Sequence, residues 1–269
     1  MENLTHYPVV VFAVAFVSLS LASAAGAWLR RRNVSMTEEH KDDLSLILAA
    51  SLTLLALIIG FSFSMATNRY DQRKNFEEAE ANAIGTEYLR ADPLPSADAA
   101  SVLKLLSYYT NQRVLFYSNT DDARRTRIDE RVGQLEADLW ATVRGPAAAQ
   151  PTPVAVLVLA GMNNVVSSQG YTQAAYWNRI PIAAWYLLAA IALCCNVLFG
   201  CRMQTTGKLA LVLPLVVSIS LLLIADIDAP RHGLIYVSPQ NLESLARSLG
   251  TKVHCVAIRC PRMVLISIP

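Results

Sequence analysis

Charged side chains are scarce in this chain of 269 residues: Asp, Glu, Lys and Arg make up only 16% of it, whereas 54% is hydrophobic. That composition is too apolar for an ordinary soluble domain and favours a membrane protein. Four runs contain no Asp, Glu, Lys, Arg or His at all, at residues 8–29, 44–66, 182–201 and 209–225. Each is close to the about 20 residues that a helix needs to cross a hydrocarbon core about 30 Å thick. The sequence therefore predicts four transmembrane helices.

Several functional classes are excluded by what is missing. The chain has no Gly-rich phosphate loop and no nucleophile elbow. The four histidines are scattered, at His6, His40, His232 and His254. We therefore predict no catalytic residues, no cofactor and no enzymatic activity. The net charge of +2 comes without a basic stripe interleaved with aromatics, so nucleic acid is not an expected partner.

Cysteine is rare and badly placed for metal binding. Three of the five cysteines lie in or at the end of the third apolar run, at Cys194, Cys195 and Cys201. Such thiols behave as small apolar side chains. Cys255 and Cys260 beside His254 make an incomplete zinc set, so we predict no metal site. A bridge between these two cysteines requires an oxidising compartment.

The first apolar run resembles a secretory signal, because Ala22-Ser23-Ala24 is similar to a cleavage site. A signal peptide has a positively charged start, but residues 1–8 contain no Lys or Arg, and the run is too long for a signal. We interpret residues 8–29 as a retained transmembrane helix.

The four runs predict an all-α membrane protein with two pairs of transmembrane helices flanking a helical middle bundle. We divide the chain into a first helix pair (1–66), a middle region (67–181), a second helix pair (182–228) and a C-terminal tail (229–269). An even number of crossings puts the two short connectors, 30–43 and 202–208, on one side of the membrane. The N-terminus, the middle region and the tail lie on the other.

The middle region shows helical periodicity throughout. The second run is expected to continue without a break to about residue 89, with Glu77, Glu78, Glu80 and Glu87 between the small and apolar residues. Pro93 and Pro95 end this helix, because the residue before a proline is driven out of the α region. Ser96 or Asp98 is expected to cap the next helix.

The clearest apolar period follows, with Ile128, Val132, Leu135 and Leu139 at steps of four, three and four. This pattern predicts a helix over about 123–143 that stops at Gly145 and Pro146. Residues 154–162, near the start of the segment 153–178, are apolar on every side of a helix. We interpret the whole segment as a buried helix of the middle bundle.

Orientation depends on Lys and Arg close to the spans. The short connectors carry Arg30, Arg31, Arg32, Lys41, Arg202 and Lys208, and the other side carries Arg69, Arg73, Lys74, Arg179 and Arg231. The triple arginine on a short loop outweighs charges beside a long region. The N-terminus is therefore predicted outside.

Charges of both signs gather where the second and fourth runs end and the third begins. The candidate cluster consists of Arg69, Arg73, Arg179, Asp226, Asp228 and Arg231. These residues either pair at the interface, where each exposed pair contributes about 0–1 kcal/mol, or line the mouth of an ion pathway, as intramembrane carboxylates often do. Ser62 and Ser64 are candidate pore-facing residues, although a bond to their own helix backbone is the commoner arrangement.

Several stretches resemble a family of uncharacterised bacterial membrane proteins with a bestrophin-like domain. They are residues 60–65 (GFSFSM), 69–73 (RYDQR), 80–86 (EANAIGT), 88–90 (YLR), 178–181 (NRIP), 224–228 (IADID), 230–231 (PR) and 233–235 (GLI). Their order along residues 44–250 is more specific than any one of them. The tail from residue 251 departs from the resemblance.

The resemblance implies similarity to bestrophins, pentameric anion channels with a helical domain between two pairs of transmembrane helices. It implies a homo-oligomer in the plasma (inner) membrane of a bacterium, with the lipid bilayer and a small ion as partners. It also implies a cytosolic middle region, against the charge count. Two functions stay open: an oligomeric anion channel, or a non-conducting structural or regulatory membrane protein whose middle region binds a partner.

Overall fold

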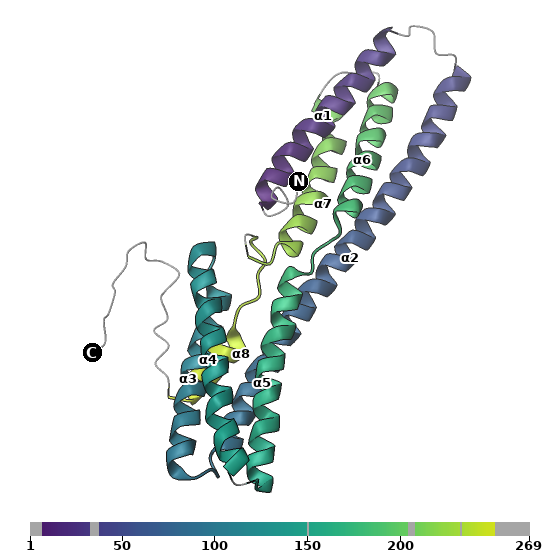
Figure 1. Cartoon of the computed structure of the whole chain (residues 1–269). Helices are drawn as coiled ribbons and strands as arrows, with labels where there is room; N and C mark the ends of the chain where they lie inside the picture. Colours follow the sequence, from purple (N-terminus) through teal and green to yellow (C-terminus); the bar gives the residue numbers. More distant parts are fainter. Residues whose placement is uncertain (1–6, 33–37, 150, 204–207, 232, 251–269) are drawn as a thin grey trace. The chain divides into compact units, whose positions relative to one another are not determined.

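A computed structural model describes residues 7–32, 38–149, 151–203, 208–231 and 233–250. The elements are α1 (Pro8–Arg32), α2 (Glu38–Ala91), α3 (Ser96–Ser118), α4 (Asp122–Ala149), α5 (Pro153–Trp177), α6 (Ile182–Arg202), the short 3-10 helix η1 (Lys208–Leu211), α7 (Val212–Asp228) and α8 (Gln240–Ser248). No strand occurs in these described ranges. The predicted all-α fold is confirmed (Figure 1).

Four helical stretches are long and apolar enough to cross a membrane, as predicted. They are Pro8–Arg32, Asp42–Ala91, Pro153–Arg202 and Lys208–Asp228. The second is much longer than a bilayer requires, because α2 runs through 54 residues without interruption. Its apolar part is residues 44–66, and its charged part, residues 67–91, continues into the middle region, as the sequence predicted.

The described chain divides into two compact units. Unit 1 comprises Met1–Asn75 and Tyr171–Val237, and unit 2 comprises Phe76–Gly170 and Ser238–Pro269. The division falls inside α2 and inside α5, so each of these helices contributes residues to both units. The short helix α8 belongs to unit 2, together with α3 and α4.

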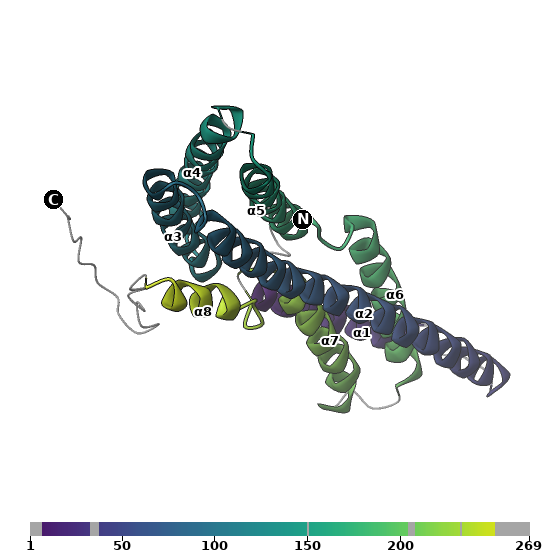
Figure 2. The ribbon, with the colours of Figure 1, turned by 90° about the horizontal axis from the view of Figure 1, so that it is seen from below.

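In unit 1, α1 packs along α6 and α7, as Figures 1 and 2 show from two directions. Helices α1 and α6 approach each other closely at Gly26 and Gly200. A Cβ on Gly26 would overlap with the carbonyl oxygen of Val197, and one on Gly200 with that of Ser23. Small residues permit such backbone contact between membrane helices, where dispersion and packing replace the hydrophobic effect.

In unit 2, α3 and α4 form a helical hairpin. The predicted apolar face of α4 is buried, because Val132, Leu135 and Leu139 are at most 1% exposed. On α3, Val102, Leu106 and Tyr109 are fully buried. The period-based prediction of this core is confirmed.

Three local predictions were wrong. Helix α4 continues through Pro146 to Ala149, because this proline removes only one hydrogen bond near the helix end and is followed by alanines, the strongest helix formers. Pro95 occupies the N-cap of α3, and neither Ser96 nor Asp98 provides a side-chain cap. Helix α5 buries one face only: Val158 and Met162 are buried, but Val156 is 58% exposed.

Apart from Ala81, the buried residues of α2 recur at spacings of seven, four and three along one stripe: Leu48, Leu55, Ser62, Ala66, Arg73, Glu77, Glu80, Ile84, Glu87 and Ala91. A spacing of 3.5 residues keeps one side of a helix facing its partners. The stripe is uncharged in residues 44–66 but carries ionisable side chains beyond Ala66. The sequence placed Glu77, Glu78, Glu80 and Glu87 between small and apolar residues without assigning them a face, and the structure buries Glu77, Glu80 and Glu87.

Candidate functional site

The candidate charge cluster is built entirely within unit 1. Helix α2 supplies Arg69 and Arg73, and the segment between α5 and α6 supplies Arg179. The last turn of α7 supplies Asp226 and Asp228, and Arg231 follows it.

Asp228 ties the end of α7 to the segment before α6. Its carboxylate accepts hydrogen bonds from the backbone N–H of Ile180, with N···O distances of 3.2 Å and 3.4 Å. Arg69, Arg73 and Arg179 all act on this carboxylate electrostatically. Asp228 is 3% exposed, so these contacts satisfy a charge that water does not reach.

Arg73 joins α2 to the same end of α7. Its Nη2 donates to the carbonyl oxygen of Ile227 at 3.0 Å, and its Nε donates to that of Arg69 at 3.2 Å. The side chain is 2% exposed. Arg69 in turn donates from Nη1 to Oδ1 of Asn178 at 3.1 Å. The arginines of α2 therefore bind the end of α7 and the segment between α5 and α6, both in unit 1.

Asp226 fastens the segment that follows α7. Its Oδ1 accepts from the backbone N–H of Leu234 at 2.7 Å, and its Oδ2 accepts from that of Ile235 at 2.9 Å. Gly233 makes this turn possible, because a Cβ there would lie 2.5 Å from the carbonyl oxygen of Asp226. Both carboxylate oxygens therefore accept hydrogen bonds from backbone amides.

The remaining arginines are held differently. Arg231 stacks over the ring of Tyr176, with its guanidinium carbon 4.4 Å from the ring centroid. Arg179 has two buried nitrogens, Nε and Nη2, without a hydrogen-bond partner in the described part of the chain. These two nitrogens of Arg179 are donors that the printed contacts of the cluster do not use.

The cluster carries an excess of positive charge. It contains four arginines and two aspartates, a formal charge of +2, and both aspartates already accept backbone hydrogen bonds. Guanidinium donors recognise anions with good geometry. No group of three or more His, Cys, Asp or Glu side chains that could hold a metal ion occurs among the described residues. The arrangement is suited to attract an anion.

The two candidate serines of α2 lie on different sides of the helix. Ser62 is 4% exposed and belongs to the buried stripe, whereas Ser64 is exposed. The cysteines of α6 are free thiols, and Cys195 is buried. Cys255, Cys260 and the histidines His6, His232 and His254 lie outside the described residues.

Sequence reasoning missed the buried glutamates of unit 2. Glu77 caps α8: its Oε1 accepts from the backbone N–H groups of Asn241 and Leu242 at 3.0 Å and 2.9 Å, and its Oε2 accepts from Asn241 Nδ2 at 2.6 Å. Burial raises the pKa of Glu77, and these hydrogen bonds offset part of that rise. The 3.5-residue spacing of Glu77, Glu80, Ile84 and Glu87 was the signal that could have revealed the row.

Glu80 forms an ion pair with Arg113 of α3, and Tyr117 donates to Oε2 of Glu80 at 3.3 Å. Arg113 also lies 4.3 Å from the ring centroid of Phe116. On the neighbouring α4, Glu136 accepts a hydrogen bond from Tyr109 at 3.0 Å. Polar contacts therefore connect α2 to α3 and α3 to α4 within unit 2.

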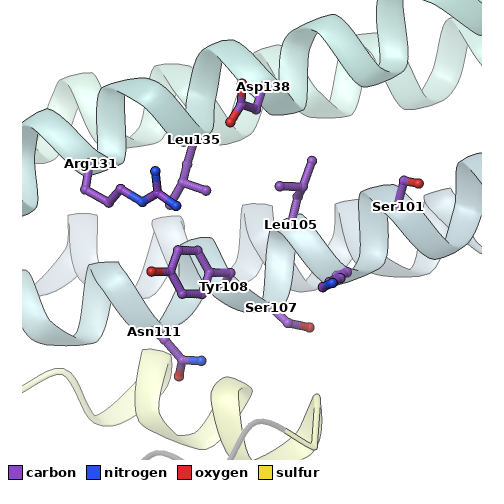
Figure 3. Close-up of a pocket in the computed structure, with 9 residues that line it drawn as sticks. Ser101, Leu105, Ser107, Tyr108, Asn111, Arg131, Leu135 and Asp138 are labelled. Carbon is purple, nitrogen blue, oxygen red and sulfur yellow. The ribbon is translucent and has the colours of Figure 1, made fainter. Parts of the chain in front are cut away.

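An open groove of about 640 Å³ lies between α3 and α4 (Figure 3). Tyr108 of α3 and Arg131 of α4 face each other across it, with the guanidinium carbon 5.4 Å from the ring centroid. Lys104 and Asp138 add charges of both signs. The lining holds no nucleophile paired with a base, so it defines no catalytic centre.

The fold and the spans define a multi-pass, all-α membrane protein. The Bestrophin-like domain model matches residues 12–242, so the chain belongs to the bestrophin-like domain family.

Solved structures agree on the fold. One structure of a bacterial bestrophin homologue from Klebsiella pneumoniae is similar with a TM-score of 0.61 at 13% identity, covering 90% of this chain and 96% of that one. A point variant of that homologue has a TM-score of 0.60 at 13% identity, and the match covers 90% of this chain and 97% of the variant. A third structure, a variant described as a membrane protein, has a TM-score of 0.62 at 14% identity. The match covers 90% of this chain and 96% of that one. No curated protein matches the sequence.

Proposed function

We propose that this protein is an oligomeric channel for small anions rather than an enzyme. The observation that carries the proposal is the arginine-rich cluster of unit 1 on a bestrophin-like fold. Because Asp226 and Asp228 already accept backbone hydrogen bonds, the arginines dominate the field that a mobile ion meets there. A cation would be repelled and an anion attracted.

Four spans in one subunit leave little room for an aqueous path, so the pore would form on a symmetry axis between subunits. The apolar window of α2 is the least covered, with 6% of it buried within the chain against 22–44% for the other three spans. This surface is available to lipid and to neighbouring subunits. We place the protein in the plasma (inner) membrane of a bacterium.

The test is flux into liposomes containing the purified full-length protein. Chloride and nitrate should enter faster than into empty liposomes, and sodium should not. Arg179→Gln should lower anion flux, because it removes a positive charge whose Nε and Nη2 donate to no group in the described part of the chain. Arg124→Gln, which changes an exposed arginine of α4, is the matched control and should conduct like the wild type. No flux above the empty liposomes would favour the alternative, a structural or regulatory membrane protein that conducts nothing.

A further inference from the structure

Glu87 is the one member of the buried glutamate row of unit 2 whose charge is not satisfied. Its side chain has no solvent exposure. Glu77 accepts three hydrogen bonds and Glu80 pairs with Arg113, but neither carboxylate oxygen of Glu87 has a hydrogen-bond partner in the described part of the chain. An isolated carboxylate in such a place is strongly disfavoured, and the neutral acid is preferred.

Helix α5 covers this carboxyl group. A Cβ on Gly161 would overlap with Oε2 of Glu87, and it would lie 2.7 Å from Nη1 of Arg90. The backbone of α5 therefore lies directly against the Glu87 carboxyl group, and a side chain at position 161 would require that group to move. Any change in the charge or hydration of Glu87 must act on this contact.

The surroundings supply little compensating charge. Helix α5 contains no Asp, Glu, Lys, Arg or His, and its titratable side chains are Tyr171 and Tyr176, which belong to unit 1. Helix α8 packs near this point through Leu245 against Gly85, and its charged side chains are Glu243 and Arg247. Among the described residues, the charged group that acts on Glu87 is Arg90, three positions along the same helix.

We propose that Glu87 is a reversible proton-binding site, and that loss of its proton loosens the packing of α5 against α2 in unit 2. The proton keeps the carboxyl group neutral where Gly161 covers it. Once ionised, the group requires water or a cation, and α5 offers neither. The site is independent of whether the protein conducts ions.

The pH range follows from burial. Burial raises the pKa of Glu87 to about 8, and Arg90 opposes only part of this rise. In the unfolded or locally opened chain the pKa returns to about 4.3, the ordinary value for glutamate. The packed state therefore binds the proton more tightly than the opened state. The stabilisation is complete below about pH 4 and is lost as pH rises toward about 8.

The experiment follows hydrogen exchange of α5 peptides from unit 2 in the purified full-length protein between pH 5 and pH 9, corrected for the intrinsic pH dependence of exchange. In the wild type, the opening equilibrium of α5 should rise about tenfold per pH unit up to about pH 8 and then level off, as one-proton linkage requires. In Glu87→Gln this rise should be absent. Glu78→Gln, which changes an exposed glutamate of the same helix, should behave like the wild type.

A second variant covers the case in which Glu87→Gln fails to fold. Arg90→Gln removes the neighbouring cation, so it should move the levelling point to higher pH while keeping the tenfold slope. Parallel pH profiles in the wild type and Glu87→Gln would overturn the proposal. So would a levelling point that Arg90→Gln leaves unmoved or shifts to lower pH.

Discussion

Glu80 and Arg113 form an ion pair in which neither side chain has any solvent-exposed surface. Nε of Arg113 donates to Oε1, and Nη2 donates to Oε2 at 3.1 Å, so the pair is bidentate. The field of Glu80 raises the pKa of Arg113 despite its burial, which keeps the guanidinium charged. The pair joins α2 to α3 inside unit 2.

Removing one partner should therefore be costly. Arg113→Met leaves the buried Glu80 carboxylate without this cation, and we expect a loss of about 3–5 kcal/mol in the free energy of unfolding. Denaturant unfolding of the purified protein measures this loss. Asp121→Asn breaks the exposed ion pair between Arg124 and Asp121 and should cost about 0–1 kcal/mol. Equal effects of the two variants would contradict a structural role for the buried pair.

The contact between α1 and α6 provides a second prediction. Gly200→Ala introduces a methyl group against the carbonyl oxygen of Ser23, which is backbone and cannot rotate away. The helices must separate, so thermal stability should fall clearly. Gly60→Ala is the control, because a Cβ at Gly60 has no neighbour within 4 Å. A wild-type melting temperature in Gly200→Ala would show that α1 and α6 are not packed this closely.

The core of unit 2 provides a third prediction. Leu135 is 1% exposed, so Leu135→Asp should bury a charge without a partner and cost several kcal/mol, enough to unfold a marginal bundle. Gln134→Asp places the same side chain one residue earlier on an exposed position and should be nearly neutral. Circular dichroism and size-exclusion chromatography compare the two. Unchanged folding and oligomer size in Leu135→Asp would mean that this face of α4 is exposed.

The sequence predicted those features that depend on local pattern. The four apolar runs and the period of Ile128, Val132, Leu135 and Leu139 were sufficient for the spans and for α4, since both follow from helix geometry. The continuity of α2 also followed, because no proline interrupts it before Pro93. These features need no knowledge of which segment packs against which.

Partners distant in the sequence could not be predicted in this way. Glu80 and Arg113 are 33 residues apart, and Asp226 accepts bonds from backbone amides that have no sequence signature. Four glutamates within eleven residues usually indicate a solvated face, and their spacing does not say which groups contact Glu77, Glu80 and Glu87. Ser62 and Ser64 formed one candidate pair in sequence but lie on different sides of α2.

Membrane topology provides a fourth prediction. A cysteine at Thr120, between α3 and α4, and one at Ser35, in the first connector, should react with an impermeant reagent from opposite sides of the membrane. The charge count predicts Ser35 inside, whereas the resemblance to bestrophins implies a cytosolic middle region and hence Thr120 inside. Labelling in intact cells and in inverted vesicles decides between the two. Reaction of both positions from one side would rule out the four-span arrangement.

Asp226 distinguishes an ion pathway from a structural fastening. Its two oxygens accept from the amides of Leu234 and Ile235, so Asp226→Asn keeps one acceptor but turns an NH2 group toward the other amide. Two donors then face each other in a buried site, which should cost about 1–3 kcal/mol in the free energy of unfolding. Because the carboxylate is already occupied, anion flux per folded oligomer should not change.

Asp71→Asn is the control for this last experiment, since Asp71 is an exposed acid on α2 near the same cluster and should affect neither property. Stability is measured by thermal unfolding, and flux is measured in liposomes at matched amounts of folded protein. A change in ion selectivity with wild-type stability would place Asp226 in a conduction pathway instead. Wild-type stability together with wild-type flux would remove both roles, because neither the backbone hydrogen bonds nor the charge would then matter to the protein.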